Sequence, residues 1–174
     1  METFLGILRR KRPESTTPEP DLSVNEYSYP FPPGTEILRT EIETISHKGP
    51  RRGAVDFIVP LGTTITCAYD GIVTEVVDKH KKHGPKRKFA NDLNYVHVFH
   101  PISGEVSEYG HLAEGSAKIH VGDRINEGDE IGITGNSGWM YEPHLHFFVY
   151  RLDPKQKEGF VGLKPRFKDE KSIK

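Results

Sequence analysis

Residues 143–150 read Pro-His-Leu-His-Phe-Phe-Val-Tyr, and the rest of the chain is organised around this stretch. Side chains alternate between the two faces of a strand, so His144 and His146 project side by side while Leu145 and Phe147 point to the other face. The β-forming residues and the leading proline predict a strand here. Two adjacent imidazoles suit a metal ligand beside a proton-transfer group. Taken alone, the pair is more simply read as two half-buried strand histidines.

Size and composition favour one domain with no membrane-spanning segment and no overall charge that would attract nucleic acid. The chain has 174 residues, enough for one core of ordinary size. A formal net charge of −1 and a pI near 6.8 provide no overall field that would select nucleic acid or an anionic membrane. No apolar run approaches the roughly 20 residues needed to span a bilayer. Cys67 is the single cysteine, which excludes an intrachain disulfide and metal sites built on two cysteines.

Composition divides the chain into three regions. Residues 1–33 are rich in proline, serine, threonine and glutamate, which predicts a disordered tail or linker. The domain is expected over residues 34–160, and residues 161–174 are expected to be a solvated C-terminal tail. The N-terminal tail ends with three aromatic residues that alternate with polar ones and suit a loose edge segment: Tyr27, Tyr29 and Phe31.

The first residues lack the pattern of a secretory signal. The apolar run at residues 4–8 precedes the basic run at residues 9–12, which reverses the order of an export signal, and the apolar run is too short. A standard export signal is therefore not expected.

The middle of the chain has the texture of an all-β fold. Short β-like runs are separated by turn signals, and no helical period is sustained. This pattern predicts a sandwich or barrel-like architecture. A basic insertion at residues 78–88 interrupts the rhythm and is most simply a solvated loop, with a patch for an anionic polymer as the alternative. The expected strands are residues 35–45, 54–59, 63–68, 71–77, 94–99, 105–109, 130–134 and 144–151.

Two further segments carry chemistry. Asp56 lies inside an apolar run, where a carboxylate is costly to bury unless it is paired or metal-bound. His111 closes another expected strand, so one carboxylate and three histidines could face a common groove. A catalytic zinc uses about three such ligands and leaves a position for water, whose pKa falls to about 7. Alone, Asp56 could instead cap a turn or pair with Arg51 or Arg52.

Several segments, in order, resemble the M23 (lysostaphin and LytM type) zinc metallopeptidases. They are residues 54–63, 68–73, 109–112, 121–132 and 135–147. The resemblance covers residues from about 45 to 150. It implies an antiparallel β-sandwich with a long groove and endopeptidase activity on the peptide bridges of bacterial peptidoglycan. Such an enzyme acts outside the cytoplasm or after lysis, and a monomer is expected.

The resemblance also implies roles for four residues. Asp56 and His146 resemble zinc ligands of a site that holds one Zn²⁺ per chain. His111 and His144 resemble the catalytic histidines, which share proton transfer and stabilisation of the oxyanion. Apolar side chains in the loop before the histidine strand could wall the groove: Trp139, Met140 and Tyr141.

The third ligand departs from the family pattern. The family places a histidine four residues before the aspartate, where this chain has Arg52, whose guanidinium only donates and cannot ligate. The nearest upstream candidate is His47, and the turn at residues 49–50 could fold it back over the strand of Asp56. We therefore predict His47 as the third metal ligand. If it is instead a solvent-facing loop histidine, the site is incomplete.

Two other functions compete with an endopeptidase. The first is a catalytically inactive LytM-like module that binds cell wall or a partner hydrolase, for which Arg52 is the one hint. The second is a biotinyl or lipoyl carrier domain, suggested by residues 121–132. A carrier needs an exposed lysine at a tight hairpin, typically beside methionine, and the chain lacks that pair.

Overall fold

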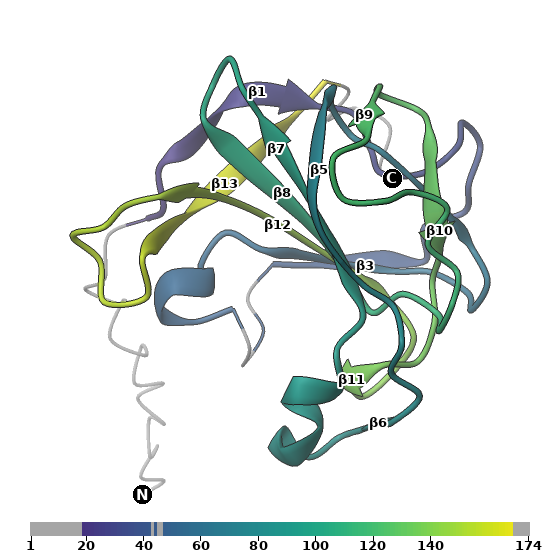
Figure 1. Ribbon diagram of the computed structural model, residues 1–174. Coiled ribbons are helices and arrows are strands. Elements are labelled where there is room, and N and C mark those ends of the chain that lie inside the picture. Colours follow the sequence, from purple (N-terminus) through teal and green to yellow (C-terminus); the bar gives the residue numbers. More distant parts are fainter. Residues whose placement is uncertain (1–18, 43, 45–46, 169–174) are drawn as a thin grey trace, which may run out of the picture.

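The computed structural model describes residues 19–42, 44 and 47–168 as an almost entirely β structure (Figure 1). Two short 3₁₀ helices occur, η1 (Gly49–Arg51) and η2 (Arg87–Asp92). Neither is long and apolar enough to cross a membrane. The strands are β1 (Leu22–Tyr27), β2 (Arg39–Glu41), β3 (Val55–Ile58), β4 (Thr64–Thr66), β5 (Gly71–Val77), β6 (His83–Gly84), β7 (Tyr95–His100), β8 (Glu105–Gly110), β9 (Arg124–Ile125), β10 (Glu130–Ile133), β11 (Gly138–Trp139), β12 (Leu145–Leu152) and β13 (Phe160–Phe167). The prediction of an all-β fold is confirmed.

One large sheet dominates and curls into a half-barrel (Figure 1). Its path runs β1-β13-β12-β8-β7-β5-β9, and β3 joins it by pairing with both β12 and β2. Most pairs are antiparallel, whereas β1 and β13 are parallel. Two small sheets, β4 with β10 and β6 with β11, complete the described structure. The finer description as a sandwich of two facing sheets stays a prediction.

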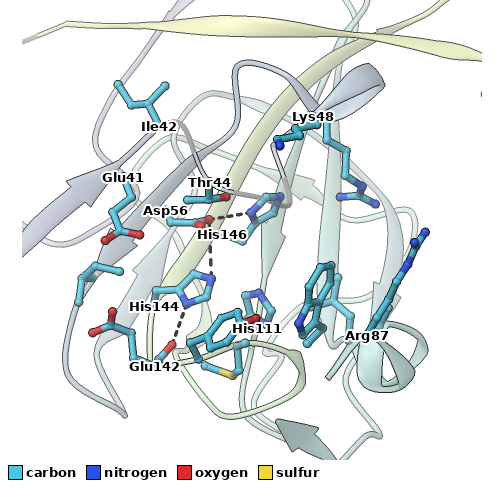
Figure 2. Close-up of a pocket in the computed structure, with 17 residues that line it drawn as sticks. Glu41, Ile42, Thr44, Lys48, Asp56, Arg87, His111, Glu142, His144 and His146 are labelled. Carbon is cyan, nitrogen blue, oxygen red and sulfur yellow. Dashed lines mark hydrogen bonds and ion pairs between the residues drawn. The ribbon is translucent and has the colours of Figure 1, made fainter. Parts of the chain in front are cut away.

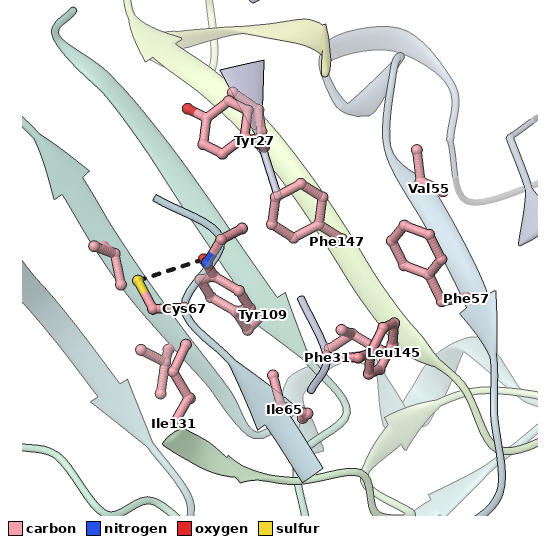
Figure 3. Packing of buried hydrophobic residues seen from close by; sticks show 14 of the residues in the cluster. Tyr27, Phe31, Val55, Phe57, Ile65, Cys67, Tyr109, Ile131, Leu145 and Phe147 are labelled. Carbon is pink, nitrogen blue, oxygen red and sulfur yellow. Dashed lines mark hydrogen bonds between the residues drawn. The ribbon is translucent and has the colours of Figure 1, made fainter. Parts of the chain in front are cut away.

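The alternation of β12 decides what faces the core. Leu145 and Phe147 are fully buried and pack with Phe57 of β3 and Tyr109 of β8 (Figure 3). Because successive side chains point to opposite faces, His146 lies on the other face of the sheet. The aromatic core thus anchors β12 and fixes the direction of its histidine.

Both ends of the described chain contribute strands, β1 and β13, although the sequence assigned these segments largely to the tails. Tyr27 in β1 and Leu163 in β13 are fully buried. The buried carboxylate of Glu105 accepts hydrogen bonds from the backbone N–H groups of Val24 and Asn25 and from the Tyr27 hydroxyl. The side chains of β1 that alternate inward are Ser23, Asn25 and Tyr27, so hydrogen bonds as well as aromatic burial attach this strand to the domain. Residues 1–18 and 169–174 lie outside the described residues.

Candidate metal centre

Three side chains converge where β3 pairs with β12. Asp56 and His146 are register partners in these strands, and His47 arrives from the loop before η1. His146 Nδ1 lies 2.8 Å from Asp56 Oδ1, and His47 Nε2 lies 3.1 Å from the same oxygen. The two nitrogens are 3.3 Å apart. Bonds of about 2.0–2.1 Å to a tetrahedral zinc separate ligand atoms by about 3.3–3.4 Å, so the three atoms stand close to the separations that zinc requires.

The backbone fixes which nitrogen of His47 faces the centre. Its Nδ1 lies 2.8 Å from the carbonyl oxygen of Ile42, so Nδ1–H donates there and Nε2 is left to face Asp56. A neutral His47 would then point a lone pair at a carboxylate. A proton or a metal cation must lie between them, and a set of two imidazoles and one carboxylate fits a divalent cation.

The ionisation of the ligand residues agrees with such a site. Burial alone would raise the pKa of Asp56, but hydrogen bonds with His146 and His47 outweigh it and hold the pKa well below its usual value. Burial lowers the pKa of His47, but the hydrogen bond and charge of Asp56 outweigh this and the pKa lies above its usual value. The Asp56 carboxylate is therefore ionised at neutral pH and offers a negative charge to a cation.

Two more histidines border the centre without joining it. His144 Nδ1–H donates to the carbonyl of Glu142 at 2.8 Å, and its Nε2 lies 3.7 Å from Asp56 Oδ1 (Figure 2). His111 Nδ1–H donates to the carbonyl of Ser137 at 2.6 Å. The rings of the two histidines lie edge to face with centroids 4.4 Å apart. In both residues the Nε2 atom remains available for proton transfer.

His111 has an unusual backbone and an unusual pKa. Its φ of 64° falls in the left-handed region, which non-glycine residues seldom adopt. This conformation follows directly after β8 and turns the ring toward His144. Burial lowers the pKa of His111 to about 3, and the charges of His144 and His146 act in the same direction. Burial also lowers the pKa of His144, so both rings are neutral at pH 7 and can accept a proton.

A groove with a volume of about 970 Å³ opens above these residues (Figure 2). Trp139, Met140 and Tyr141 line it, as the sequence predicted for this loop. Lys48 and Arg87 lie on one side of the histidines in the view, whereas acidic side chains such as Glu142 lie on the other. The centre is therefore at the base of a groove that has apolar contacts and both signs of charge at its rim.

The sequence profile of peptidase family M23 matches residues 50–158. The chain belongs to this family. An uncharacterized metalloprotease of Buchnera aphidicola subsp. Baizongia pistaciae is 32% identical over 107 residues, which cover 61% of this chain and 25% of that protein. Peptidoglycan DD-endopeptidase ShyC of Vibrio cholerae is 31% identical over 102 residues, or 59% of this chain and 19% of that protein. The chain thus spans a quarter or less of the length of these relatives.

A solved structure from Pseudomonas aeruginosa, described as a candidate M23 peptidase, has the same fold. It matches with a TM-score of 0.50 and 22% identity, over 75% of this chain and 48% of that one. The M23 match begins after His47, so the place of this histidine rests on geometry alone. The structure brings all five predicted site residues together, but their roles stay predictions.

Sequence reasoning missed one buried carboxylate beside the M23 site. Glu108 in β8 lies on the same face of the sheet as His146 and contacts Arg51 and His97. A glutamate in an alternating strand gave no distinctive signal, since most such residues face water.

Asn94 is buried and forms hydrogen bonds with backbone atoms of His80 and Leu112, which supports a structural role for it.

Proposed function

We propose that the protein is a zinc-dependent endopeptidase that hydrolyses peptide bonds in bacterial peptidoglycan. The observation that carries this proposal is the convergence of three ligand atoms, from His47, Asp56 and His146, within 3.3 Å of one another beside two neutral histidines. Membership of family M23 supports a peptidase. The relative ShyC is a peptidoglycan DD-endopeptidase, which supports the choice of substrate.

His47, Asp56 and His146 would hold the zinc ion. A zinc ion in this position supplies Lewis acidity, which lowers the pKa of water and polarises a peptide carbonyl. The protein contributes a donor set with two neutral imidazoles and one carboxylate, which leaves the ion a net positive charge. The ligand side chains are buried, so they are held in place by packing as well as by hydrogen bonds.

His111 and His144 would move the protons. Their Nδ1–H groups are occupied by backbone carbonyls, so each neutral ring presents the lone pair of Nε2. Such a ring accepts the proton that the attacking water loses and returns it to the nitrogen of the leaving amine. Once protonated, the same Nε2–H can donate to the oxyanion that develops on the carbonyl oxygen. Two adjacent rings can therefore divide proton transfer and oxyanion stabilisation between them.

The groove would bind the peptide on both sides of the scissile bond. The apolar side chains of Trp139 and Met140 offer contact area for the peptide. Charged side chains line the groove on both sides of the histidines (Figure 2). Peptidoglycan peptides carry both carboxylates and amines, which suits a rim of mixed charge. The inactive-module alternative is not favoured, because His47 Nε2 lies 3.1 Å from Asp56 Oδ1 and 3.3 Å from His146 Nδ1, which supports His47 as the ligand that Arg52 could not supply.

Hydrolysis of purified sacculi tests the proposal. The protein should reduce the turbidity of sacculi, a chelator should abolish this loss, and added zinc should restore it. His144→Ala should be inactive, whereas His120→Ala, which alters an 89% exposed imidazole, should match the wild type. Mass spectrometry of the released fragments would identify the bond that is cleaved. Stoichiometric zinc with no release of fragments would refute the enzyme and favour a binding module.

A further inference from the structure

The carboxylate of Glu108 is buried next to the metal centre. Its side chain is 6% exposed, and its oxygens lie 3.0 Å from Arg51 Nη1 and 2.9 Å from His97 Nε2. Glu108 is the register partner of Phe148, two residues beyond His146 on β12, so it is a diagonal neighbour of His146 on the same face. This places Glu108 Oε1 3.8 Å from His146 Nε2.

The Nε2 atom of His146 lacks a hydrogen-bond partner. Within the part of the chain that the structure describes, it is the buried side-chain polar atom left unsatisfied. Buried polar atoms are nearly always hydrogen-bonded, so an orphan next to a functional centre needs a physical explanation. The oxygen of Glu108 is the acceptor that faces it.

The tautomer of His146 links the two observations. Nδ1 is the atom that faces Asp56 and His47, so it must present a lone pair if His146 is to ligate a cation. The proton of the neutral ring then resides on Nε2 and needs an acceptor. We propose that Glu108 is a positioning residue that accepts this proton in a hydrogen bond and so holds His146 in the metal-binding tautomer and orientation. This inference rests on the proposed metal centre.

Neighbouring side chains hold the Glu108 carboxylate next to His146. Its oxygens accept hydrogen bonds from Arg51 Nη1 at 3.0 Å and from His97 Nε2 at 2.9 Å, so the carboxylate is held from two sides. The guanidinium of Arg51 also lies over the ring of Phe148, with 5.7 Å between its Cζ atom and the ring centroid. This contact restrains the guanidinium that holds the Glu108 carboxylate. A movement of about 1 Å would bring Oε1 within hydrogen-bond distance of Nε2.

Zinc affinity measured against a chromophoric chelator tests the proposal without using activity. Glu108→Ala should weaken zinc binding by about 10- to 100-fold, as losses of partners of metal ligands do. Glu108→Gln should weaken it less than alanine, because its amide oxygen still accepts a hydrogen bond. Glu75→Gln is the matched control, because Glu75 also contacts His97, at 3.1 Å, but lies on its far side from Glu108.

The outcomes distinguish a failure of the Glu108 proposal from a failure of the proposed metal centre. Wild-type affinity in Glu108→Ala, or an equal loss in Glu75→Gln, would overturn the role of Glu108 even if the wild type cleaves sacculi. Failure of the wild type to bind zinc would overturn the metal centre itself. If Glu108→Ala does not fold, NMR of the zinc-loaded wild type decides. A proton on Nε2 of His146 with a coupling to Glu108 supports the proposal, and a proton on Nδ1 refutes it.

Discussion

Replacing His47 by alanine tests the residue whose role depends most on the structure. Three ligand atoms share the centre at separations of 2.8–3.3 Å, so none is peripheral to it. Structural zinc sites have apparent binding free energies of about 10–16 kcal/mol. If three ligands share this roughly equally, loss of one removes about 3–5 kcal/mol, which weakens zinc binding by about two to four orders of magnitude.

The assay is a chelator competition at neutral pH, with thermal unfolding of the metal-free protein as the check on folding. His47→Ala should retain the metal-free fold, because His47 lies in a loop and contributes no strand. His120→Ala controls for the general loss of an imidazole, since it is 89% exposed. The reasoning is refuted if His47→Ala binds zinc within about threefold of the wild type.

Three other changes probe the neighbourhood of the centre and the core. His111→Ala should reduce kcat by about 10²- to 10⁴-fold while zinc affinity stays unchanged, and a parallel loss of zinc would contradict a role in proton transfer. Gly135→Ala would place a Cβ 2.3 Å from Ala113 Cα, so urea unfolding should show a loss of about 1–3 kcal/mol, and unchanged stability would disprove the clash. Burial lowers the pKa of His100 below 6.5. Just below pH 6.5 His100 is therefore protonated in the unfolded chain but still neutral in the folded one, so the free energy of unfolding falls as the pH is lowered. His100→Gln should remove up to about 1.4 kcal/mol of this loss per pH unit. Urea unfolding between about pH 6.5 and 5 measures this, and an unchanged slope of unfolding free energy against pH would contradict the role of His100.

The strands near the site were predictable because turn residues mark their ends. The expected strand at residues 71–77 coincides with β5, and the expected strand at residues 144–151 is shifted by one residue from β12. The strands at the two ends, β1 and β13, were not predicted. Proline and charged residues lower the average hydrophobicity there, while the alternation that buries Tyr27 becomes informative only once its partner strand is known.

The candidate site was accessible to sequence reasoning in its residue types but not in its geometry. The resemblance predicted roles for Asp56 and for three histidines, and His47 followed from the absence of a ligand at Arg52. The three histidines are His111, His144 and His146. Glu108 could not be found this way, because its surroundings depend on Arg51, which lies 57 residues away in the sequence. A buried ion pair of this kind is visible only after the strands are in register.

The separation of the ligands along the chain has a consequence for folding. His146 meets Asp56 and His47 across 90 and 99 residues, respectively. Contacts of such high sequence separation form late and slowly, since each requires closure of a long loop. We therefore expect that nascent, partly folded chains have little affinity for zinc and that the ion is acquired by the completed domain. In this protein the metal would then set the onset of activity after synthesis, with no part in nucleating the fold.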